Sequence, residues 1–327
     1  MSTAQSSTIE HVSTGGAIVH AAGLRKSYGD KDAVRGVDLE VAQGEIFGFI
    51  GPSGAGKTTS VRLLTGIERP DAGTLEVMDG DPSRFNAEQR SRIGYMPQLS
   101  VLFPSLSLWE NLSFVASIYG MPLRRKQTLT EALELVNLYD DRRTRLRNAS
   151  GGMQRRLAMA AALVHDPPLL FLDEPTAGID PVLRRRFWDH FGRLRDQGRT
   201  LFVTTQYVTE ASYCDRVAVL TDGRVLAVDT PDGLRKRAFG GELLDVETPH
   251  PLPGEALDEL LRLEGVFDAR ARDRGRRLHR LVVADATDIA PVVRQRLRDR
   301  RVQIDDISQH MPSFDDVFVA LVEGTRR

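Results

Sequence analysis

The sequence predicts an α/β protein with a parallel sheet at its core, followed by a small α+β domain. Two strongly apolar strands, PLLFLDEP and TLFVTT, flank the helical segment PVLRRRFWDHFGRLRDQG. Continuous apolar strands that alternate with helices are typical of a parallel sheet with both faces covered. A glycine-rich loop, GPSGAGKTT, also lies between an apolar strand and a helix. At 327 residues the chain is long enough for this sheet and a second domain.

The elements of the first domain follow from the hydrophobic pattern. Alternating apolar residues predict strands across residues 17–50. Helical spacing begins after Lys57, a strand covers residues 73–80, and residues 105–165 are mainly helical. After the two apolar strands, RVAVLTDG and RVLAVDT predict two more strands, which complete this domain near residue 238.

Glycines and prolines in AFGGELLDVETPHPLPGEA indicate a domain boundary near residue 240. Beyond it the order strand, helix, two strands, helix, strand fits a ferredoxin-like sandwich, with a last helix at FDDVFVALVEG. The strands expected there are LLDVET, VFDARARD, RLHRLVVAD and VQIDDIS, and the helices are GEALDELLRLEG and APVVRQRLRDR. We therefore expect a disordered tail over residues 1–16, a large domain over 17–238 with a helical part at about 99–165, and a C-terminal domain over 241–327.

Composition and charge argue against a nucleic-acid partner, an internal disulfide, a transmembrane segment and a signal peptide. The formal net charge is −1, and acidic residues balance the arginine cluster of the C-terminal region, so we expect no nucleic-acid partner. The single cysteine, Cys214, rules out an internal disulfide, suits a reducing compartment and is interpreted as buried. No run of 18 apolar residues occurs, and MSTAQSSTIEHV has neither an apolar core nor a cleavage site. We expect neither a transmembrane segment nor a signal peptide.

The loop GPSGAGKTT has the setting of a phosphate-binding loop, because a strand precedes it and a helix follows it. Its glycines allow backbone N–H groups to surround phosphate oxygens at the positive end of a helix dipole. We expect Lys57 to reach the β- and γ-phosphates of ATP and Thr58 to ligate Mg²⁺. The candidate phosphate-binding residues are Gly51, Pro52, Ser53, Gly54, Ala55, Gly56, Lys57, Thr58 and Thr59.

Two further motifs complete the pattern. In LLFLDEP a buried strand would bring Asp173 to the magnesium ion and Glu174 beside the γ-phosphate, where its carboxylate would polarise the attacking water. In NASGGMQRR, Ser150 can cap a helix that opens with Gly151 and Gly152, which makes an anion site at the helix N-terminus. Each motif alone is common, but together with the phosphate loop they are specific.

The order of phosphate loop, SGG helix and Asp-Glu strand resembles the ATP-binding cassette (ABC) family over about residues 17–238. The resemblance implies an antiparallel β subdomain and a helical subdomain beside the parallel sheet. It further implies that Tyr28 stacks on adenine, that Gln98 senses the γ-phosphate and ligates Mg²⁺, and that Asp180 crosses a dimer interface. Family members work as head-to-tail dimers, in which the SGG helix of one subunit clamps the ATP bound by the other.

Two positions depart from the family pattern. Met153 replaces the usual glutamine after SGG, and we expect little effect, since Ser150 and the backbone make the anion contacts. Gln206 replaces a histidine that bonds the γ-phosphate in family members. A glutamine amide can donate a hydrogen bond, but it carries no charge and does not titrate near neutral pH. We expect Gln206 to keep the catalytic role, with hydrolysis slowed several-fold rather than abolished.

TTQY followed by EA and DRVAVL resembles the ATP-binding subunits of daunorubicin-resistance and multidrug exporters, as does the tail SFDDVFVALVEG. The resemblance implies ATP hydrolysis that powers a separate transmembrane permease, with a drug, antibiotic or lipid-like cargo. It places the chain at the cytoplasmic face of the membrane, held there by the permease. Phe103 and Trp109, in QLSVLFPSLSLWENL, are candidate permease contacts and equally candidates for core packing. Because every nucleotide motif is present in one chain, a homodimer is favoured.

Two other functions stay open at this point. A soluble mechanical ATPase of the same family, as in DNA repair or on ribosomes, would have a long coiled coil between phosphate loop and SGG helix, or two cassettes per chain. The sequence has no heptad run there and only one such loop. An unrelated P-loop kinase or GTPase would lack the SGG helix, and no NKxD guanine motif is present. The exporter subunit is therefore the preferred interpretation.

Overall fold

The computed structural model describes residues 16–99 and 101–325. The tail predicted over residues 1–16 lies outside the described residues, apart from Gly16. No helix in the described ranges is long and apolar enough to cross a membrane. Cys214 is buried, with 6% of its surface exposed, and burial raises the pKa of its thiol.

The chain divides into two compact units, each with its own core. The first unit extends to Gln206 and includes Asp222–Arg224. The second unit comprises Tyr207–Thr221 and the chain from Val225 onward. The domain limits expected from the sequence, near residues 238 and 241, stay predictions.

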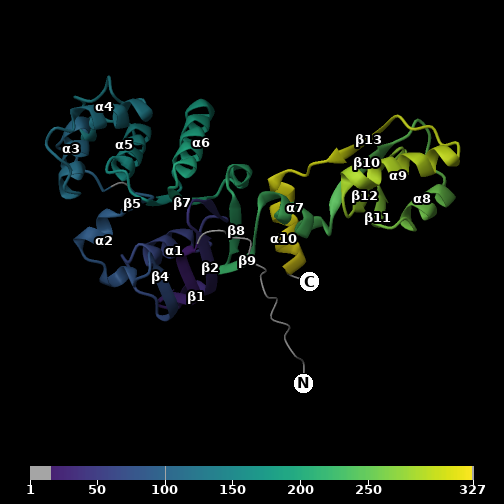
Figure 1. The fold of residues 1–327 in the computed structure, drawn as a ribbon, viewed down its shortest axis with the longest axis horizontal. Coiled ribbons are helices and arrows are strands. Elements are labelled where there is room, and N and C mark those ends of the chain that lie inside the picture. The colour runs from purple at the N-terminus through teal and green to yellow at the C-terminus, as the bar shows by residue number, and fades with distance from the viewer. Residues whose placement is uncertain (1–15, 100, 326–327) are drawn as a thin grey trace. The chain divides into compact units, whose positions relative to one another are not determined.

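A parallel sheet in the order β5-β6-β7-β3 forms the centre of the first unit (Figure 1). Its strands are β5 (Ile93–Met96), β6 (Leu169–Asp173), β7 (Thr200–Thr205) and β3 (Ile46–Ile50). The last three are buried along their whole length, as strands covered on both faces must be. Phe202 packs against three other phenylalanine rings, with centroids 5.3–5.7 Å away. The parallel sheet core is therefore confirmed.

A second, antiparallel sheet in the order β2-β1-β4 confirms the expected β subdomain. Its strands are β2 (Lys31–Ala42), β1 (Ala17–Tyr28) and β4 (Ala72–Val77). The helices of the first unit are α1 (Lys57–Leu64), α2 (Ala87–Ser91), α3 (Leu108–Ile118), α4 (Lys126–Leu135), α5 (Gly151–Leu163) and α6 (Pro181–Asp196). Helices α3, α4 and α5 pack together at one end of this unit (Figure 1), as expected for a helical subdomain.

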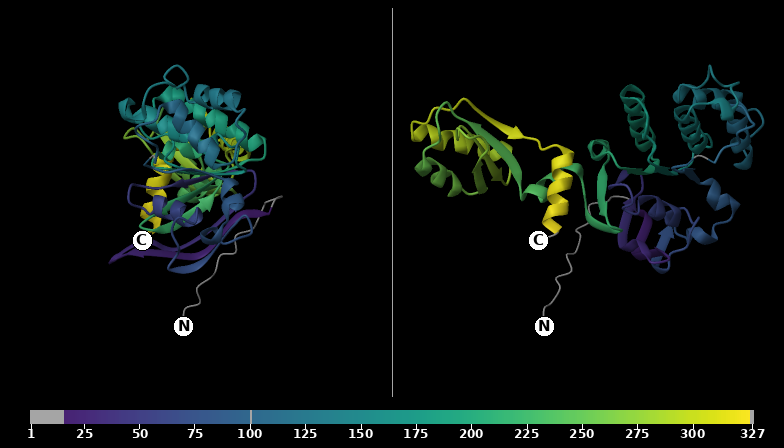
Figure 2. Two further views of the ribbon diagram at one scale, coloured as in Figure 1. Left: turned by 90° about the vertical axis from the view of Figure 1, so that its left-hand side faces the viewer. Right: turned by 180° about the vertical axis from the view of Figure 1, so that it is seen from behind.

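The second unit contains a four-stranded antiparallel sheet in the order β11-β12-β10-β13, with α8 and α9 packed on it (Figure 2). Its strands are β10 (Glu242–Glu247), β11 (Val266–Ala271), β12 (Leu278–Val283) and β13 (Asp306–His310); the helices are α8 (Gly254–Leu261) and α9 (Ala286–Asp299). This order confirms the ferredoxin-like sandwich. The unit also holds β8 (Arg216–Thr221), all but the first residue of β9 (Arg224–Asp229), α7 (Pro231–Phe239) and α10 (Phe314–Thr325), and α10 packs against α7.

Some boundaries differ from the sequence-based expectation for identifiable reasons. Helix α9 begins four residues early, because the Asp285 side chain accepts hydrogen bonds from two backbone N–H groups of its first turn. Strand β13 begins at Asp306, four residues later than expected. Val302, where the strand was expected to begin, packs against the core of the sandwich. Helix α7 was not expected, although Pro231 at its first position and Gly240 at its C-cap are ordinary helix signals.

Candidate functional site

The loop after β3 has the geometry of a phosphate cradle. Its first residue is tied to the sheet by a hydrogen bond from Gly51 N to the Thr205 carbonyl, 3.3 Å long. Gly56 has φ 105°, and a Cβ on this residue would lie 2.3 Å from the Ala33 carbonyl oxygen. Only glycine fits there, for reasons of both conformation and space. Helix α1 starts immediately afterwards, without a side-chain cap on its N-terminal N–H groups, which suits an anionic ligand.

Lys57 is buried inside this loop, with 4% of its surface exposed. Its ammonium group donates to the carbonyls of Gly51 and Pro52, at 2.8 and 3.1 Å, and lies 3.2 Å from Glu174 Oε1. A buried ammonium needs such partners, because its desolvation is costly. The cation expected to bind phosphate and the expected catalytic carboxylate therefore form an ion pair.

Thr204, in the neighbouring strand β7, fixes both acidic residues at the end of β6. Its hydroxyl donates to Asp173 Oδ1 at 2.5 Å and accepts from the Glu174 N–H at 3.0 Å. The same N–H donates to the Thr204 carbonyl, also at 3.0 Å. Glu174 adopts φ 52°, a left-handed conformation that a non-glycine residue keeps only when its surroundings hold it.

The carboxyl group of Asp173 has the properties of a metal ligand. It is fully buried, and burial raises its pKa, while the bond from Thr204 acts in the opposite direction. Its Oδ2 atom has no hydrogen-bond partner among the described residues. Close by, the Thr58 hydroxyl donates to Gln98 Oε1 at 3.3 Å. These oxygen donors and one buried carboxylate fit Mg²⁺, which usually takes one or two carboxylates together with substrate phosphates and water.

Arg155 connects helix α5 to this site. Its guanidinium group donates to the backbone carbonyls of Gln98 at 3.2 Å and Asp173 at 3.3 Å, and to the carbonyl of Glu174. One side chain therefore joins the loop after β5 that contains Gln98 (the glutamine loop), the acidic end of β6 and the helix that begins with the SGG sequence.

Tyr28 lies at the end of β1 with 45% of its surface exposed. Its hydroxyl group donates to the carboxylate of Glu68, which also pairs with Arg62 at 3.2 Å. The exposed ring is available for a stacked base, so the expected adenine contact stays a prediction.

The remaining expected residues make their hydrogen bonds away from the Lys57 cluster or are exposed. The Ser150 hydroxyl caps α5 by accepting from Met153 N at 3.2 Å, and Gly151 and Gly152 are exposed at the start of this helix. The Asp180 carboxylate caps α6 by accepting from the N–H of its third helical residue at 3.0 Å. Gln206 follows β7 directly and is exposed. The structure thus brings Lys57, Thr58, Gln98, Asp173 and Glu174 together, and leaves exposed the groups expected to act across a dimer.

An apolar groove of about 630 Å³ lies beside the glutamine loop. Among its lining residues, Leu99 and Val101 are 81% and 86% exposed. The nearby Phe103 ring is also exposed and meets Phe114 edge-on at 4.8 Å, whereas Trp109 is half-buried. Apolar side chains this exposed are typical of a surface that binds another protein.

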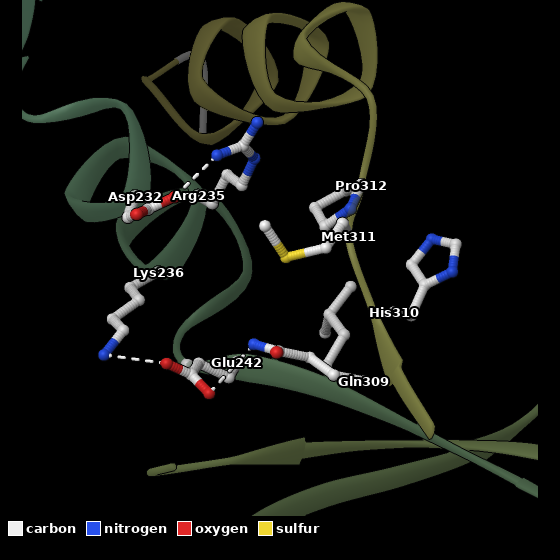
Figure 3. Close-up of a pocket in the computed structure, with 10 residues that line it drawn as sticks. Asp232, Arg235, Lys236, Glu242, Gln309, His310, Met311 and Pro312 are labelled. Carbon is white, nitrogen blue, oxygen red and sulfur yellow. Dashed lines mark hydrogen bonds and ion pairs between the residues drawn. The ribbon is translucent and has the colours of Figure 1, made fainter. Parts of the chain in front are cut away.

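A smaller pocket of about 270 Å³ lies in the second unit, between α7 and the ends of β10 and β13 (Figure 3). Its charged groups are paired with one another. Arg235 bonds Asp232 at 2.6 Å, Lys236 bonds Glu242 at 2.9 Å, and Gln309 also donates to Glu242. This pocket has no free ionic group for chemistry, and its polar contacts connect α7 to the sheet.

Three residues of the site were missed by the sequence analysis. Arg155 gave no signal, because it is one of two adjacent arginines in a helix with many possible partners. Glu68 likewise lies in a polar turn without a recognisable motif. Thr204 did carry a signal: a threonine that follows the apolar run at residues 201–203 in a strand expected to be buried needs a hydrogen-bond partner, and the acids lie at the corresponding end of the neighbouring strand.

Comparison with known proteins gives a consistent result. A family model described as ABC transporter matches residues 34–177. The chain is 40% identical to the daunorubicin resistance ATP-binding protein DrrA3 of Streptomyces coeruleorubidus, over 93% of this chain and 96% of that protein. It is 35% identical to the Nod factor export ATP-binding protein I of Rhizobium sp. (strain N33), again over 93% of this chain and 96% of that protein.

Two solved structures resemble the fold. An ATP-binding subunit of an ABC transporter aligns with a TM-score of 0.63 and 27% identity, over 68% of this chain and 93% of its own. A dimeric ATP-binding cassette in a post-hydrolysis state, bound to ADP and phosphate, aligns with a TM-score of 0.60 and 25% identity, over 65% of this chain and 98% of its own.

The double role of Thr204 leads to a stability prediction. Replacing it with valine keeps the shape but removes the hydroxyl that holds Asp173 and Glu174. Thr204→Val is expected to destabilise the first unit by about 1–3 kcal/mol, since it leaves a buried carboxylate oxygen unpaired. Calorimetric unfolding measures this cost. Thr204→Ser, which keeps the hydroxyl, is the control, and equal losses in both variants would contradict the assigned role.

Proposed function

The chain belongs to the ABC transporter family as an ATP-hydrolysing subunit of the exporter type, and we propose that it powers a separate transmembrane permease. The observation that carries this proposal is the convergence of Lys57, Asp173 and Glu174 at the carboxyl ends of β3 and β6. In parallel sheets, ligands bind at this edge.

In the proposed complex, ATP places its phosphates on the N–H groups of the glycine loop. Lys57 exchanges its carbonyl partners and Glu174 for the β- and γ-phosphates. Mg²⁺ would be held by Thr58, Gln98 and Asp173, whose unpaired Oδ2 supports this assignment, and it would neutralise phosphate charge. Tyr28 would stack on the adenine.

Once Lys57 is drawn to phosphate, the Glu174 carboxylate is free to act on water. It accepts a proton from the attacking water as the water oxygen bonds to the γ-phosphorus and the bond to the β–γ bridging oxygen breaks, giving ADP and phosphate. The exposed amide of Gln206 would donate a neutral hydrogen bond to the γ-phosphate.

We propose that two copies bind two ATP molecules between them. The N-terminus of α5, with Ser150, Gly151 and Gly152, would bind the γ-phosphate held by the other subunit, and Asp180 would lie at the shared interface. The exposure of the α5 N-terminus supports this arrangement. ATP then favours the closed dimer by its differential affinity, and hydrolysis reopens the dimer.

The apolar groove beside Gln98 is the proposed docking site for the permease, which would hold the chain at the cytoplasmic face of the membrane. Leu99 and Val101 would enter that interface with the exposed Phe103 ring. The relatives are named for daunorubicin resistance and Nod factor export. We propose a drug, antibiotic or lipid-like cargo and no nucleic-acid partner.

Purification from native cells in mild detergent tests the function. We expect the tagged chain to retain a stoichiometric protein with several apolar segments of about 20 residues. Val101→Asp, in the groove, should reduce this recovery at least about tenfold without affecting ATP hydrolysis by the chain alone. Val292→Asp, at an exposed position of α9, is the control. Recovery of only soluble, ribosomal or nucleic-acid partners would overturn the exporter assignment in favour of a mechanical ATPase.

Glu174→Gln removes the proton acceptor and should lower ATP turnover at least about a hundredfold. Because ATP binding is retained, the variant should accumulate as an ATP-bound dimer, which size-exclusion chromatography with ATP and Mg²⁺ detects. Turnover close to that of the unmodified chain would remove Glu174 from the role of base.

Gln206→His introduces a donor that can carry a positive charge at the position directly after β7. We expect turnover to rise several-fold, in line with the difference between neutral and charged hydrogen bonds, and to gain a pH dependence near neutrality. Steady-state hydrolysis between pH 6 and 8 measures both effects. An increase of about a hundredfold or more would show that glutamine had disabled the native site.

A further inference from the structure

We propose that Arg155 is a positioning residue that holds the backbone of Glu174 and Gln98 in the orientation needed for hydrolysis. Because Arg155 belongs to helix α5, that orientation depends on where α5 lies. The Arg155 guanidinium group reaches the carbonyls of Gln98, Asp173 and Glu174. The first belongs to the loop after β5, and the other two belong to the end of β6. Arginine suits this task, because its planar group holds several donors in a fixed arrangement.

The backbone of Glu174 explains why this contact matters for hydrolysis. With φ 52°, the residue is in a conformation that must be imposed by its neighbours. Thr204 holds its N–H from the side of β7, and Arg155 holds its carbonyl from the side of α5. Without Arg155, the Glu174 carbonyl keeps only its bond from the Ala177 N–H, at 3.2 Å, and no longer contacts helix α5. The carboxylate that must meet the water is then less firmly oriented.

Arg155 lies five residues after Ser150, the N-cap of α5, which corresponds to about 7.5 Å along the helix axis. In the proposed dimer, the N-terminus of α5 contacts the ATP of the other subunit. A displacement of α5 therefore changes the bonds that Arg155 makes to Glu174 and Gln98 of its own site. In this way the occupancy of one nucleotide site would alter the geometry of the other. This link rests on the proposed function.

Hydrolysis measurements on the purified full chain test the proposal. Arg155→Met should lower kcat at least about tenfold, while KM for ATP changes less than about threefold, because a positioning residue acts on the reaction rather than on nucleotide binding. Arg155→Lys should recover part of kcat, since an ammonium group supplies donors but not the planar fork. The melting temperature reports whether each variant is folded.

Arg142→Met is the matched control. Arg142 also belongs to the helical region, and its guanidinium group donates to the Tyr139 carbonyl at 2.8 Å. We expect its kcat to stay within about twofold of the unmodified chain. The proposal is overturned if Arg155→Met keeps kcat within that range, if Arg142→Met loses as much, or if KM rises in proportion to the loss of kcat.

A double-mutant cycle with Ser150→Ala tests the dependence on α5. If Arg155 transmits the state of this helix, the kcat loss caused by Ser150→Ala should be smaller when Arg155 is methionine. Additive losses would overturn the link. Failure of the proposed function would appear separately, as full activity of Glu174→Gln or as no ATP hydrolysis by the unmodified chain.

Discussion

The peptide between Asp173 and Glu174 is the point on which the site depends. Thr204 bonds the Asp173 carboxylate and the Glu174 N–H from the neighbouring strand, and Arg155 bonds both carbonyls from helix α5. Lys57 completes the enclosure through its ion pair with the Glu174 side chain. The phosphate loop, the acidic strand end, the glutamine loop and the helical region are thus joined through a few atoms, so the orientation of one carboxylate depends on all four.

Such a site is costly to fold. Asp173 and Lys57 are both buried and give up most of their hydration on folding, and Asp173 Oδ2 has no hydrogen-bond partner among the described residues to offset that loss. The surrounding sheet offsets this cost with apolar packing. Strands β3, β6 and β7 are buried throughout, and the aromatic cluster around Phe202 is formed by rings of the same three strands. The rigid apolar layer also limits how far the polar groups can relax, which preserves their geometry for the ligand.

Much of this arrangement followed from the sequence, because strongly local signals carried it. Glycine spacing, apolar strands ending in acids, and strand–helix alternation predicted the parallel core and the ferredoxin-like sandwich. The local sequence pattern could not predict which distant backbone groups a long side chain would contact. Arg155 and Arg156 are adjacent, yet Arg155 reaches the acidic strand end, while Arg156 bonds the carbonyls of Val136 and Asn137 at the end of α4. The partner of each arginine depends on the three-dimensional placement of α5. The roles assigned to Tyr28, Ser150 and Asp180 stay predictions, since they concern bound ATP or a second subunit.

The buried thiol of Cys214 can report slow local opening of the native chain without any added label site. It is the only thiol in the sequence, it lies just after the short helix at Val208–Tyr213, and burial raises its pKa. A thiol reagent requires an exposed thiolate, so labelling can proceed only when this part of the second unit opens. At reagent concentrations high enough for labelling to outpace reclosing, the labelling rate of the unaltered protein equals the rate of those openings. A change in that rate on adding nucleotide would show that binding at the phosphate loop alters the opening of the segment around Cys214.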